Sequence, residues 1–244
     1  MASNFVAPLQ LSVVVPVRNE QDNVASLIAE IAAALSVEYE IIYVDDGSTD
    51  ATLSTLKRLQ KQYPQLRVVH HEKSCGQSTA VRTGVKLAKY DWIATLDGDG
   101  QNDPADIPKL LAALAAGVEL VGGNRRASRR DTWIKRISSV IANTVRSKML
   151  RDDTPDTGCG LKLFSRAAFL DLPYFDHMHR FLPALIKRGG GKILSVPVSH
   201  RNREHGKSNY GTIDRLLVGI VDLLGVAWLQ RRAKIPYIVE DKVI

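Results

Sequence analysis

The first 125 residues alternate between short apolar runs and longer segments in which apolar residues recur every three or four positions. Leu11–Pro16 is a β-branched apolar run, which is typical of a buried parallel strand. A helix is predicted after it over residues 22–35, because five apolar residues then share one helical face. These residues are Val24, Leu27, Ile28, Ile31 and Leu35.

The same alternation predicts four further strands, at Glu40–Val44, Arg67–His70, Trp92–Leu96 and Glu119–Gly122. Between them, helices are predicted over residues 52–63 and 77–88, and from Asp103 and Pro104 onward, where an N-cap acceptor precedes a first-turn proline. Strands and helices at this spacing predict an α/β fold with a doubly wound, mostly parallel sheet and flanking helices. Ligands of such sheets bind beyond the carboxyl ends of the strands.

The pattern changes after residue 124. Thr132–Leu150 is predicted to be a basic amphipathic helix, and a turn-rich stretch then leads to residues 160–164. A helix near Arg180–Arg188 precedes a strand near Ile193–Val198, and a polar segment leads into an apolar helix from about Ile213 to Leu229. We therefore expect one α/β domain over residues 1–210, followed by a C-terminal helix and tail over residues 211–244.

The last helix is apolar around most of its circumference, with Arg215 and Asp222 on a narrow polar strip. Trp228 near its end and the following Arg231, Arg232 and Lys234 favour an amphipathic helix that lies in a membrane interface. A core or dimer helix fits almost as well, and a homo-oligomer stays open. No window reaches the roughly 18 apolar residues of a membrane span, and the N-terminus lacks a signal-peptide pattern. We expect a cytoplasmic protein, peripheral on the cytoplasmic face of the membrane.

Charge is distributed unevenly along the chain. Residues 1–120 contain 10 Lys and Arg against 15 Asp and Glu, which gives −5, and the remaining residues contain 23 against 11, which gives +12 and the total of +7. This asymmetry favours cations bound by one half and phosphates by the other. Nucleic acid is not expected as a partner, because no nucleic-acid motif is visible and few aromatic residues are available for base stacking. The cysteines, Cys75 and Cys159, have neither metal nor redox spacing.

Polar motifs follow three of the predicted strands. The first strand ends in Pro16–Glu20 without a Gly-x-Gly-x-x-Gly turn, which disfavours a dinucleotide dehydrogenase. The second ends in Asp45-Asp46-Gly47-Ser48, which suits hydrogen bonding to ribose or a base edge but equally suits turn chemistry. The fourth ends in Asp97-Gly98-Asp99-Gly100-Gln101. Two acids separated by a glycine favour a hard divalent cation that shares its coordination shell with phosphate oxygens.

Together these three motifs resemble the inverting glycosyltransferases of family 2, which have the GT-A fold. The resemblance implies nucleotide contact near Pro16, Arg18, Glu20 and Asp46. It also implies Mg or Mn bound by Asp99, with Asp97 and Gln101 alongside, and it places Asp97 against the donor as well.

The second half looks like the dolichol-phosphate mannose synthase group and its bacterial polyprenyl-phosphate relatives. The matching segments are Gly123–Arg125, Asp156–Lys162, Met178–Ala184 and His200–Tyr210. This resemblance implies a nucleotide diphosphate sugar as donor and a polyprenyl phosphate as acceptor. A mannosyltransferase is one form of this function, but the second and third segments differ from the usual Ser-Gly-Phe pattern, so the sugar stays open.

The basic residues of the second half gain a role from this chemistry. A phosphate monoester is already an oxyanion, so the acceptor needs little proton removal, and arginine is the side chain best suited to holding it. Arg125, Arg130, Lys135, Arg136 and Ser139 are the candidates for the acceptor phosphate. Arg203 and Lys207 are expected to close over the donor diphosphate. The catalytic set is therefore Asp97, Asp99, Arg125 and Arg203.

Two other functions fit the same motifs. A family 2 transferase that acts on a hydroxyl of a glycan or soluble acceptor needs a carboxylate base, for which Asp156 is the candidate. A non-catalytic nucleotide-sugar-binding partner of a membrane complex is the second alternative, and the intact acidic pair argues against it. The histidines at 70, 71, 177 and 179 lack metal-ligand spacing, so structural roles are favoured, although His179 and Arg180 lie in a matched segment and are candidates for lining the acceptor or sugar pocket.

Overall fold

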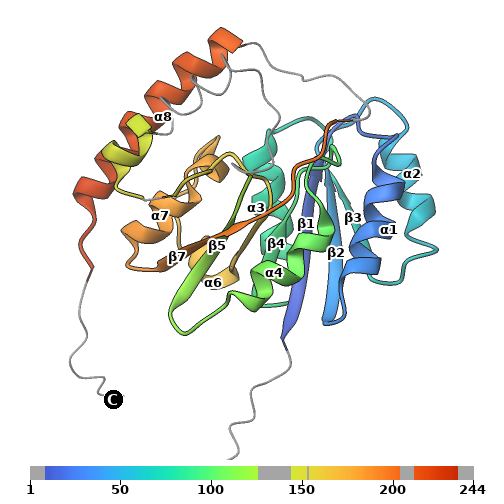
Figure 1. Cartoon of the computed structure of the whole chain (residues 1–244). Helices are drawn as coiled ribbons and strands as arrows, with labels where there is room; N and C mark the ends of the chain where they lie inside the picture. Colours follow the sequence, from blue (N-terminus) through green and yellow to red (C-terminus); the bar gives the residue numbers. More distant parts are fainter. Residues whose placement is uncertain (1–8, 126–143, 153, 204–211, 236–244) are drawn as a thin grey trace, which may run out of the picture.

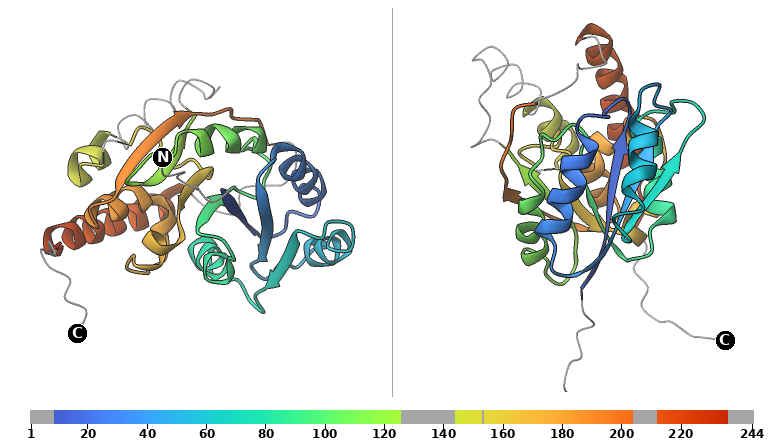
Figure 2. Two further views of the ribbon diagram at one scale, coloured as in Figure 1. Left: turned by 90° about the horizontal axis from the view of Figure 1, so that it is seen from below. Right: turned by 90° about the vertical axis from the view of Figure 1, so that its right-hand side faces the viewer.

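The computed structural model describes residues 9–125, 144–152, 154–203 and 212–235 (Figure 1). Within these residues the centre of the protein is a seven-stranded sheet in the order β3-β2-β1-β4-β6-β5-β7. Helices lie on both faces of this sheet (Figure 2). The predicted doubly wound α/β architecture is therefore confirmed.

The first half of the chain follows the predicted alternation. Its parallel strands are β1 (Gln10–Val17), β2 (Glu38–Asp45), β3 (Leu66–His70) and β4 (Trp92–Thr95), and its connecting helices are α1 (Val24–Ala34), α2 (Thr52–Leu59) and α3 (Gln77–Leu87). Alternate residues of β1 explain the layers: Val13 and Val15 join the core under α1, whereas Val14 joins the core under α3. Both faces of β1 are buried, which is why its sequence is a continuous apolar run.

Helix ends differ from the prediction by a few residues. Helix α2 stops at Leu59 rather than Tyr63, because residues 60–62 form turns. The segment after Asp103 begins as a single 3-10 turn, η1 (Pro104–Asp106), in which the Asp103 side chain accepts a hydrogen bond from the Ala105 amide. Helix α4 (Ile107–Ala112) follows at once. The predicted cap and first-turn proline are present, on a tighter turn than expected.

The second half contains the one reversed strand of the described sheet. β5 (Val118–Asn124) and β7 (Lys192–Pro197) are parallel neighbours, whereas β6 (Lys162–Ser165) is antiparallel to both β4 and β5. The short helix α6 (Arg166–Leu170) follows β6 and was not predicted. The helix predicted near residues 180–188 consists of η2 (Met178–Arg180) and α7 (Leu182–Arg188).

This topology brings the candidate site residues together at the edge of the sheet where the parallel strands end. β1, β2, β4 and β5 run in the same direction, so their carboxyl ends lie at the same edge of the sheet. Val17, Asp45 and Asn124 are the last residues of β1, β2 and β5, and Asp97 lies just beyond the end of β4. Because β6 runs the other way, its first residue, Lys162, lies at this edge as well. The edge is thus the place where the sheet is expected to bind ligands.

Helix α8 (Thr212–Arg232) extends the predicted apolar helix at both ends and lies beside α7 at the rim of the molecule (Figure 1). Val226 is buried, and Gln230 Nε2 donates to the carbonyl oxygens of Leu150 (2.9 Å) and Ala184 (3.2 Å). No helix in the described part of the chain is long and apolar enough to cross a membrane. Of the helix predicted at 132–150, residues 144–150 are helical and residues 132–143 lie outside the described ranges. The domain boundary at 210/211 also lies outside them and stays a prediction.

Candidate active site

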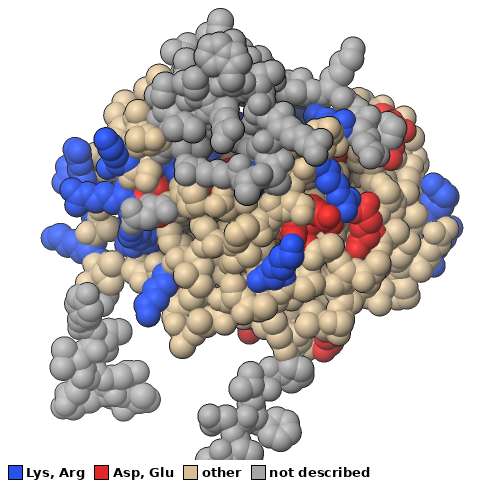
Figure 3. Space-filling view, in the orientation of Figure 1, with Lys and Arg blue, Asp and Glu red and all other residues tan. Residues whose placement is uncertain are grey.

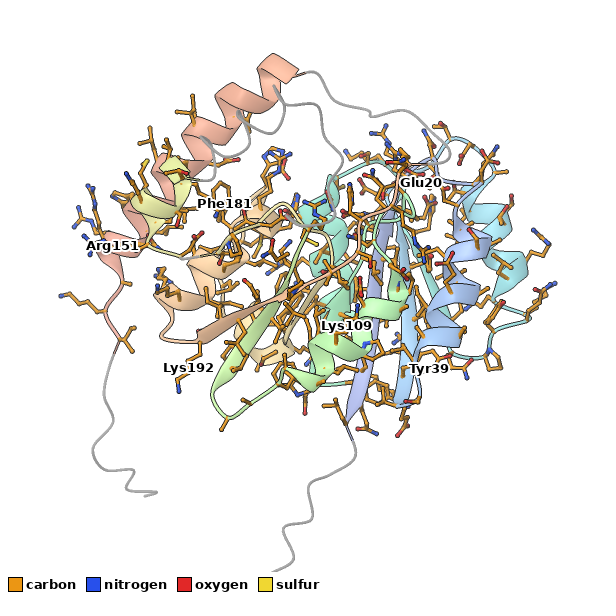
Figure 4. The ribbon with its side chains drawn as sticks, in the orientation of Figure 1. Glu20, Tyr39, Lys109, Arg151, Phe181 and Lys192 are labelled. Carbon is orange, nitrogen blue, oxygen red and sulfur yellow. The ribbon has the colours of Figure 1, made fainter. Side chains whose placement is uncertain are left out.

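A cleft of about 790 Å³ lies at the carboxyl edge of the sheet. Figure 4 shows Glu20 at this edge, among side chains from several strand ends. Every predicted site residue that the structure describes lines the cleft: Pro16, Arg18, Glu20, Asp46, Asp97, Asp99, Gln101, Arg125 and Arg203. The other predicted residues, Arg130, Lys135, Arg136, Ser139 and Lys207, lie outside the described ranges.

The acidic pair begins two residues beyond β4. Gln77 Nε2, from the first turn of α3, donates to Oδ1 of Asp97 (2.8 Å), and the Asp97 amide donates to Asn102 Oδ1 (3.2 Å). The loop needs glycine at position 98, since a Cβ there would lie 2.3 Å from Val17 Cγ1. The Asp99 side chain is 18% exposed, and its Oδ1 accepts a hydrogen bond from the Gln101 amide (3.1 Å). The two carboxylates are therefore held by their own loop and by α3.

Burial raises the pKa of Asp97, and the charge of Asp99 raises it further. The cations Lys162 and Arg125 and the hydrogen bond from Gln77 act in the opposite direction. Two carboxylates so close together repel each other, and any cation placed between them relieves this repulsion. The pair thus favours a cation on electrostatic grounds.

The two acids at the end of β2 have different environments, and the sequence left their roles undecided. Asp45 is a turn residue, because its Oδ1 accepts from the Ser48 amide (3.2 Å) and its Oδ2 lies 2.8 Å from His70 Nδ1. Asp46 lines the cleft and accepts hydrogen bonds from Ser74 Oγ (2.7 Å) and from the amides of Cys75 (2.8 Å) and Gly76 (2.9 Å). The turn interpretation therefore holds for Asp45, whereas nucleotide contact by Asp46 stays a prediction.

The carboxylate of Asp46 is kept ionised by this cradle. Burial alone would raise its pKa, but the hydrogen bonds from the Cys75 amide, His71, Ser74 and the Gly76 amide together hold the pKa below its ordinary value. Asp46, His71 and Cys75 also place one potential metal-ligand atom each within 4.8 Å of the others. Both ring nitrogens of His71 already have partners, Asp46 (2.7 Å) and Thr83 (3.0 Å). Hydrogen bonding therefore accounts for this cluster without a metal.

Arg203 lies between the strand ends of β1 and β4. Its Nη2 contacts Glu20 Oε1 (2.5 Å) and lies 3.9 Å from Asp99 Oδ2. Burial raises the pKa of Glu20, and Arg203 and Asn23 oppose this effect. The backbone before Arg203 is fixed as well, since the Arg201 amide donates to the Gln101 carbonyl (3.0 Å). The structure thus brings a predicted donor-closing arginine directly beside the acidic pair.

The basic side of the cleft is built around a buried ion pair. Arg125 donates from Nε to Asp156 Oδ2 (2.8 Å) and from Nη2 to Oδ1 (3.0 Å), and its backbone amide reaches Oδ2 as well (3.2 Å). Burial would lower the pKa of Arg125, but Asp156 raises it above its ordinary value. Both oxygens of Asp156 are therefore committed to Arg125, which does not suit the catalytic-base role considered for Asp156.

The cleft also contains Lys162 and Gln77, which were not predicted as site residues, and His179, which was a candidate for its lining. Lys162 is buried and donates to the Cys159 carbonyl, and burial lowers the pKa of its ammonium group. Gln77 binds Asp97, and His179 Nδ1 lies 2.7 Å from Ser78 Oγ. Burial lowers the pKa of His179 well below 6.5, so its imidazole is neutral. Lys162 and His179 lie in segments that the sequence analysis matched, and that membership was the only signal for them.

Comparison with known proteins agrees with this geometry. The model of "Glycosyl transferase family 2" matches residues 12–172. The dodecaprenyl-phosphate galacturonate synthase of Rhizobium johnstonii is 37% identical over 93% of this chain and 69% of its own length. The undecaprenyl-phosphate 4-deoxy-4-formamido-L-arabinose transferase of Edwardsiella ictaluri is 34% identical over 86% of this chain and 65% of its own length. The chain thus spans about two thirds of each relative.

Solved structures show the same fold at lower identity. Glucosyl-3-phosphoglycerate synthase from Mycobacterium tuberculosis in complex with uridine diphosphate has a TM-score of 0.68 and 19% identity, over 93% of this chain and 81% of that one. Its complex with Mn²⁺, uridine diphosphate and glucosyl-3-phosphoglycerate has a TM-score of 0.67 and 21% identity over the same shares. The expected GT-A architecture and the resemblance to bacterial polyprenyl-phosphate transferases are both confirmed. The chain belongs to glycosyl transferase family 2.

Proposed function

We propose that this chain transfers a sugar from a nucleotide diphosphate sugar to the phosphate of a polyprenyl lipid, with inversion at the anomeric carbon. The observation that carries the proposal is a single cleft in which Asp97 and Asp99 lie close to the cations Arg125 and Lys162. The acidic side suits a diphosphate bound through a cation, and the basic side suits a second phosphate. The names of both curated relatives support this acceptor, since they specify dodecaprenyl and undecaprenyl phosphate.

The nucleotide is assigned to the side of the cleft formed by β1 and β2. Asp46 is ionised there, and its two oxygens already have four partners: His71, Ser74 and the amides of Cys75 and Gly76. Its role is therefore to fix the loop of residues 74–76 beside the nucleotide. Pro16 and Arg18 line the same side. A preorganised loop loses little entropy on binding, which favours donor affinity.

The acidic pair fits a hard divalent cation, Mg²⁺ or Mn²⁺. The available donors are the Asp97 and Asp99 carboxylates and the Gln101 amide oxygen, and these ions prefer oxygen ligands while keeping positions for phosphate and water. An ion held by these residues would supply Lewis-acid stabilisation of the charge on the diphosphate. Complexes of the Mycobacterium tuberculosis enzyme with Mn²⁺ or Mg²⁺ and uridine diphosphate support this assignment.

The acceptor needs orientation more than activation. A phosphate monoester carries its nucleophilic oxygen as an anion at neutral pH, so the site does not require a carboxylate base. Arg125 is fixed by Asp156, and Lys162 is fixed by the Cys159 carbonyl, so both present cationic groups with little freedom. Their role is to hold the lipid phosphate near the donor without repulsion between the two anions. The commitment of Asp156 to Arg125 counts against a hydroxyl acceptor.

The decisive experiment replaces Asp99 by alanine. We expect transfer to a polyprenyl phosphate to fall at least about 100-fold, because the variant loses an electrostatic interaction that stabilises the transition state. The melting temperature should stay unchanged, since Asp99 is partly exposed. Asp171→Ala removes an exposed carboxylate at the end of α6 and serves as the matched control. Near-normal transfer by Asp99→Ala in buffer with Mg²⁺ and Mn²⁺ would refute the site, and activity that survives chelation would refute the metal.

The identity of the sugar is part of the same experiment. The relatives' names specify galacturonate and 4-deoxy-4-formamido-L-arabinose, so a mannosyl donor stays a prediction. A screen of radiolabelled nucleotide sugars with undecaprenyl phosphate, glycans and free sugars as acceptors separates the alternatives. Label in the lipid alone supports the proposal, label in a glycan supports the hydroxyl-acceptor alternative, and binding without turnover supports the non-catalytic one.

We further propose that the outer face of α8 rests on the membrane surface that contains the acceptor. Five apolar residues are exposed on it: Val218, Ile220, Val221, Leu224 and Trp228. Arg231 and Arg232 end the helix, and Lys and Arg side chains gather at this end of α8 in Figure 3. Arg151, labelled beside α8 in Figure 4, belongs to the same region. An apolar stripe beside a basic cluster is complementary to a bilayer with anionic headgroups. The cytoplasmic face remains a prediction.

This surface is tested with Leu224→Glu. Leu224 is 58% exposed, so a charge there should leave the fold intact but weaken sedimentation with phosphatidylglycerol-containing vesicles about tenfold, because a charge opposes burial in the bilayer interface. Leu170→Glu, at another exposed leucine (36%), is the matched control and should bind as the wild type does. If Leu224→Glu instead changes the oligomeric state in gel filtration and leaves vesicle binding intact, the stripe is a contact between copies of the chain.

A further inference from the structure

Helix α8 presents a polar residue to the protein rather than to solvent. Its outward face is the apolar stripe, whereas Asp222, Val226 and Gln230 lie on the inward face. Asp222 Oδ2 is buried and lies 3.2 Å from His177 Nδ1. Asp176 and Arg180 are the other charged groups near it. A carboxylate on the inward face of this helix costs desolvation, so it needs a reason beyond packing.

His177 begins the turn that reaches the cleft. Its φ is +62°, a left-handed conformation that few residues other than glycine adopt, and η2 follows directly. Within η2, His179 and Arg180 line the cleft. Ser78 Oγ contacts both the His179 ring (2.7 Å) and the His179 amide (3.3 Å), and Ser78 is the neighbour of Gln77, which binds Asp97. A continuous series of contacts thus joins α8 to the acidic pair.

We propose that Asp222 is a positioning residue. When α8 binds a lipid surface, the contact of Asp222 with His177 changes the position of the turn at His177, and so the cleft. The inference rests on the proposed function, including the membrane contact of α8. A lipid surface can favour one position of the turn only if the seated helix and the turn are energetically linked. The Asp222–His177 pair is that link, because it joins a side chain on the inward face of α8 to the residue that begins the η2 turn, and Arg180 within η2 adds attraction to the same carboxylate.

Gln230 provides a matched control on the same face of the same helix. It holds α8 through the carbonyl oxygens of Leu150 and Ala184, neither of which lines the cleft. Gln230→Ala therefore loosens α8 without touching the turn, whereas Asp222→Asn keeps the shape of the side chain and removes the charge. A merely structural role would make the two variants alike, and a positioning role would separate them.

The first test is hydrogen exchange of the backbone amides of residues 175–182 in the full chain. It is measured with and without phosphatidylcholine vesicles that contain phosphatidylglycerol. We expect vesicles to slow exchange in the wild type and in Gln230→Ala, but not in Asp222→Asn or His177→Gln. The second test compares undecaprenyl phosphate in vesicles with a short, water-soluble polyprenyl phosphate. Asp222→Asn should lose about fivefold in rate with the first acceptor and little with the second, a coupling of ordinary size.

The possible results test the proposed function and this inference separately. If the wild type does not bind vesicles or does not transfer to polyprenyl phosphate, the proposed function fails and this inference fails with it. If the wild type binds vesicles but exchange in residues 175–182 is unchanged, the inference alone is overturned. It is also overturned if Asp222→Asn keeps the vesicle effect, or if Gln230→Ala loses it equally. Should Asp222→Asn fail to fold, His177→Gln decides the same question from the other partner.

Discussion

Gly47, in the turn after β2, holds the nucleotide side of the cleft in place, and replacing it by alanine should damage both stability and donor binding. Its φ is +68°, in the left-handed region, and a Cβ at this position would lie 2.7 Å from the Ser74 amide nitrogen and 2.8 Å from the Lys73 carbonyl carbon. Both obstacles are backbone atoms, so they do not yield as a flexible side chain would. Because ordinary contacts begin at 3.4 Å, the segment must move by about 3.4 − 2.7 = 0.7 Å.

Two separate losses of folding free energy add up in Gly47→Ala. A left-handed alanine costs about 1–2 kcal/mol, and forced overpacking costs about 1–3 kcal/mol more, so the expected loss is about 2–5 kcal/mol. The displaced segment also carries the hydrogen-bond donors of Asp46, from Ser74 to Gly76. A shift of this size disturbs three short hydrogen bonds to one carboxylate, and we expect the donor KM to rise at least about tenfold, because hydrogen bonds to charged groups contribute about 1.5–3 kcal/mol.

Gly117→Ala is the control, since Gly117 has φ +77° but its Cβ would meet only the Lys192 side chain, at 3.7 Å. It carries the left-handed cost without the collision and lies in the turn before β5. Urea unfolding measures the two stability losses, and a donor titration measures KM. If Gly47→Ala loses no more stability than Gly117→Ala and keeps the wild-type donor KM, the proposed link between this turn and the Asp46 cradle is wrong.

Two further predictions concern buried charge. Arg125→Ala leaves Asp156 buried without its main partner, so urea unfolding should show a loss of about 3–5 kcal/mol. Glu30→Gln breaks the exposed pair with Arg201 and should cost at most about 1 kcal/mol; similar losses in both variants would contradict the first estimate. His179 has a pKa lowered by burial well below 6.5, so only the unfolded chain takes up its proton as the pH falls below that value. Its stability contribution is complete above pH 6.5 and is lost below it, so the melting temperature should fall more in the wild type than in His179→Gln between about pH 7.5 and about pH 5.5. Equal falls would show that His179 is not held neutral.

Much of the fold was predictable because it depends on local patterns. β1 and β2 are buried on both faces, so their sequences are continuous apolar runs, and the helices between them repeat apolar residues at helical spacing. The direction of β6 was not predictable, since an apolar run of four residues reads the same in a parallel and an antiparallel strand. The split of the helix near residue 180 escaped as well, because it lies at Phe181, whose backbone is not helical (φ −112°, ψ 8°) although its sequence neighbours favour a helix.

The acidic pair was predictable because its two members and their glycines are consecutive in the chain. The basic side was not, since its geometry depends on pairs that are distant in sequence. Arg125 meets Asp156 across 31 positions, and Ser78 meets His179 across 101. For Lys162 the sequence offered only its membership of a matched segment, because its importance comes from burial at the start of a strand whose direction the sequence did not reveal.

Charged residues of the two signs line the described part of the cleft in equal number. Five carboxylates line its described part, Glu20, Asp46, Asp97, Asp99 and Asp156, and so do five cationic residues, Arg18, Arg125, Lys162, Arg180 and Arg203. The formal sum is 5 − 5 = 0, so these residues alone do not provide net positive charge for a diphosphate and a lipid phosphate together. Arg125 and Arg203 are moreover engaged with Asp156 and Glu20. A divalent cation at Asp97 and Asp99 changes this balance where the donor must bind, because it turns the acidic side into an anion site. The charge balance of the cleft therefore supports the proposed metal dependence, as the motif does.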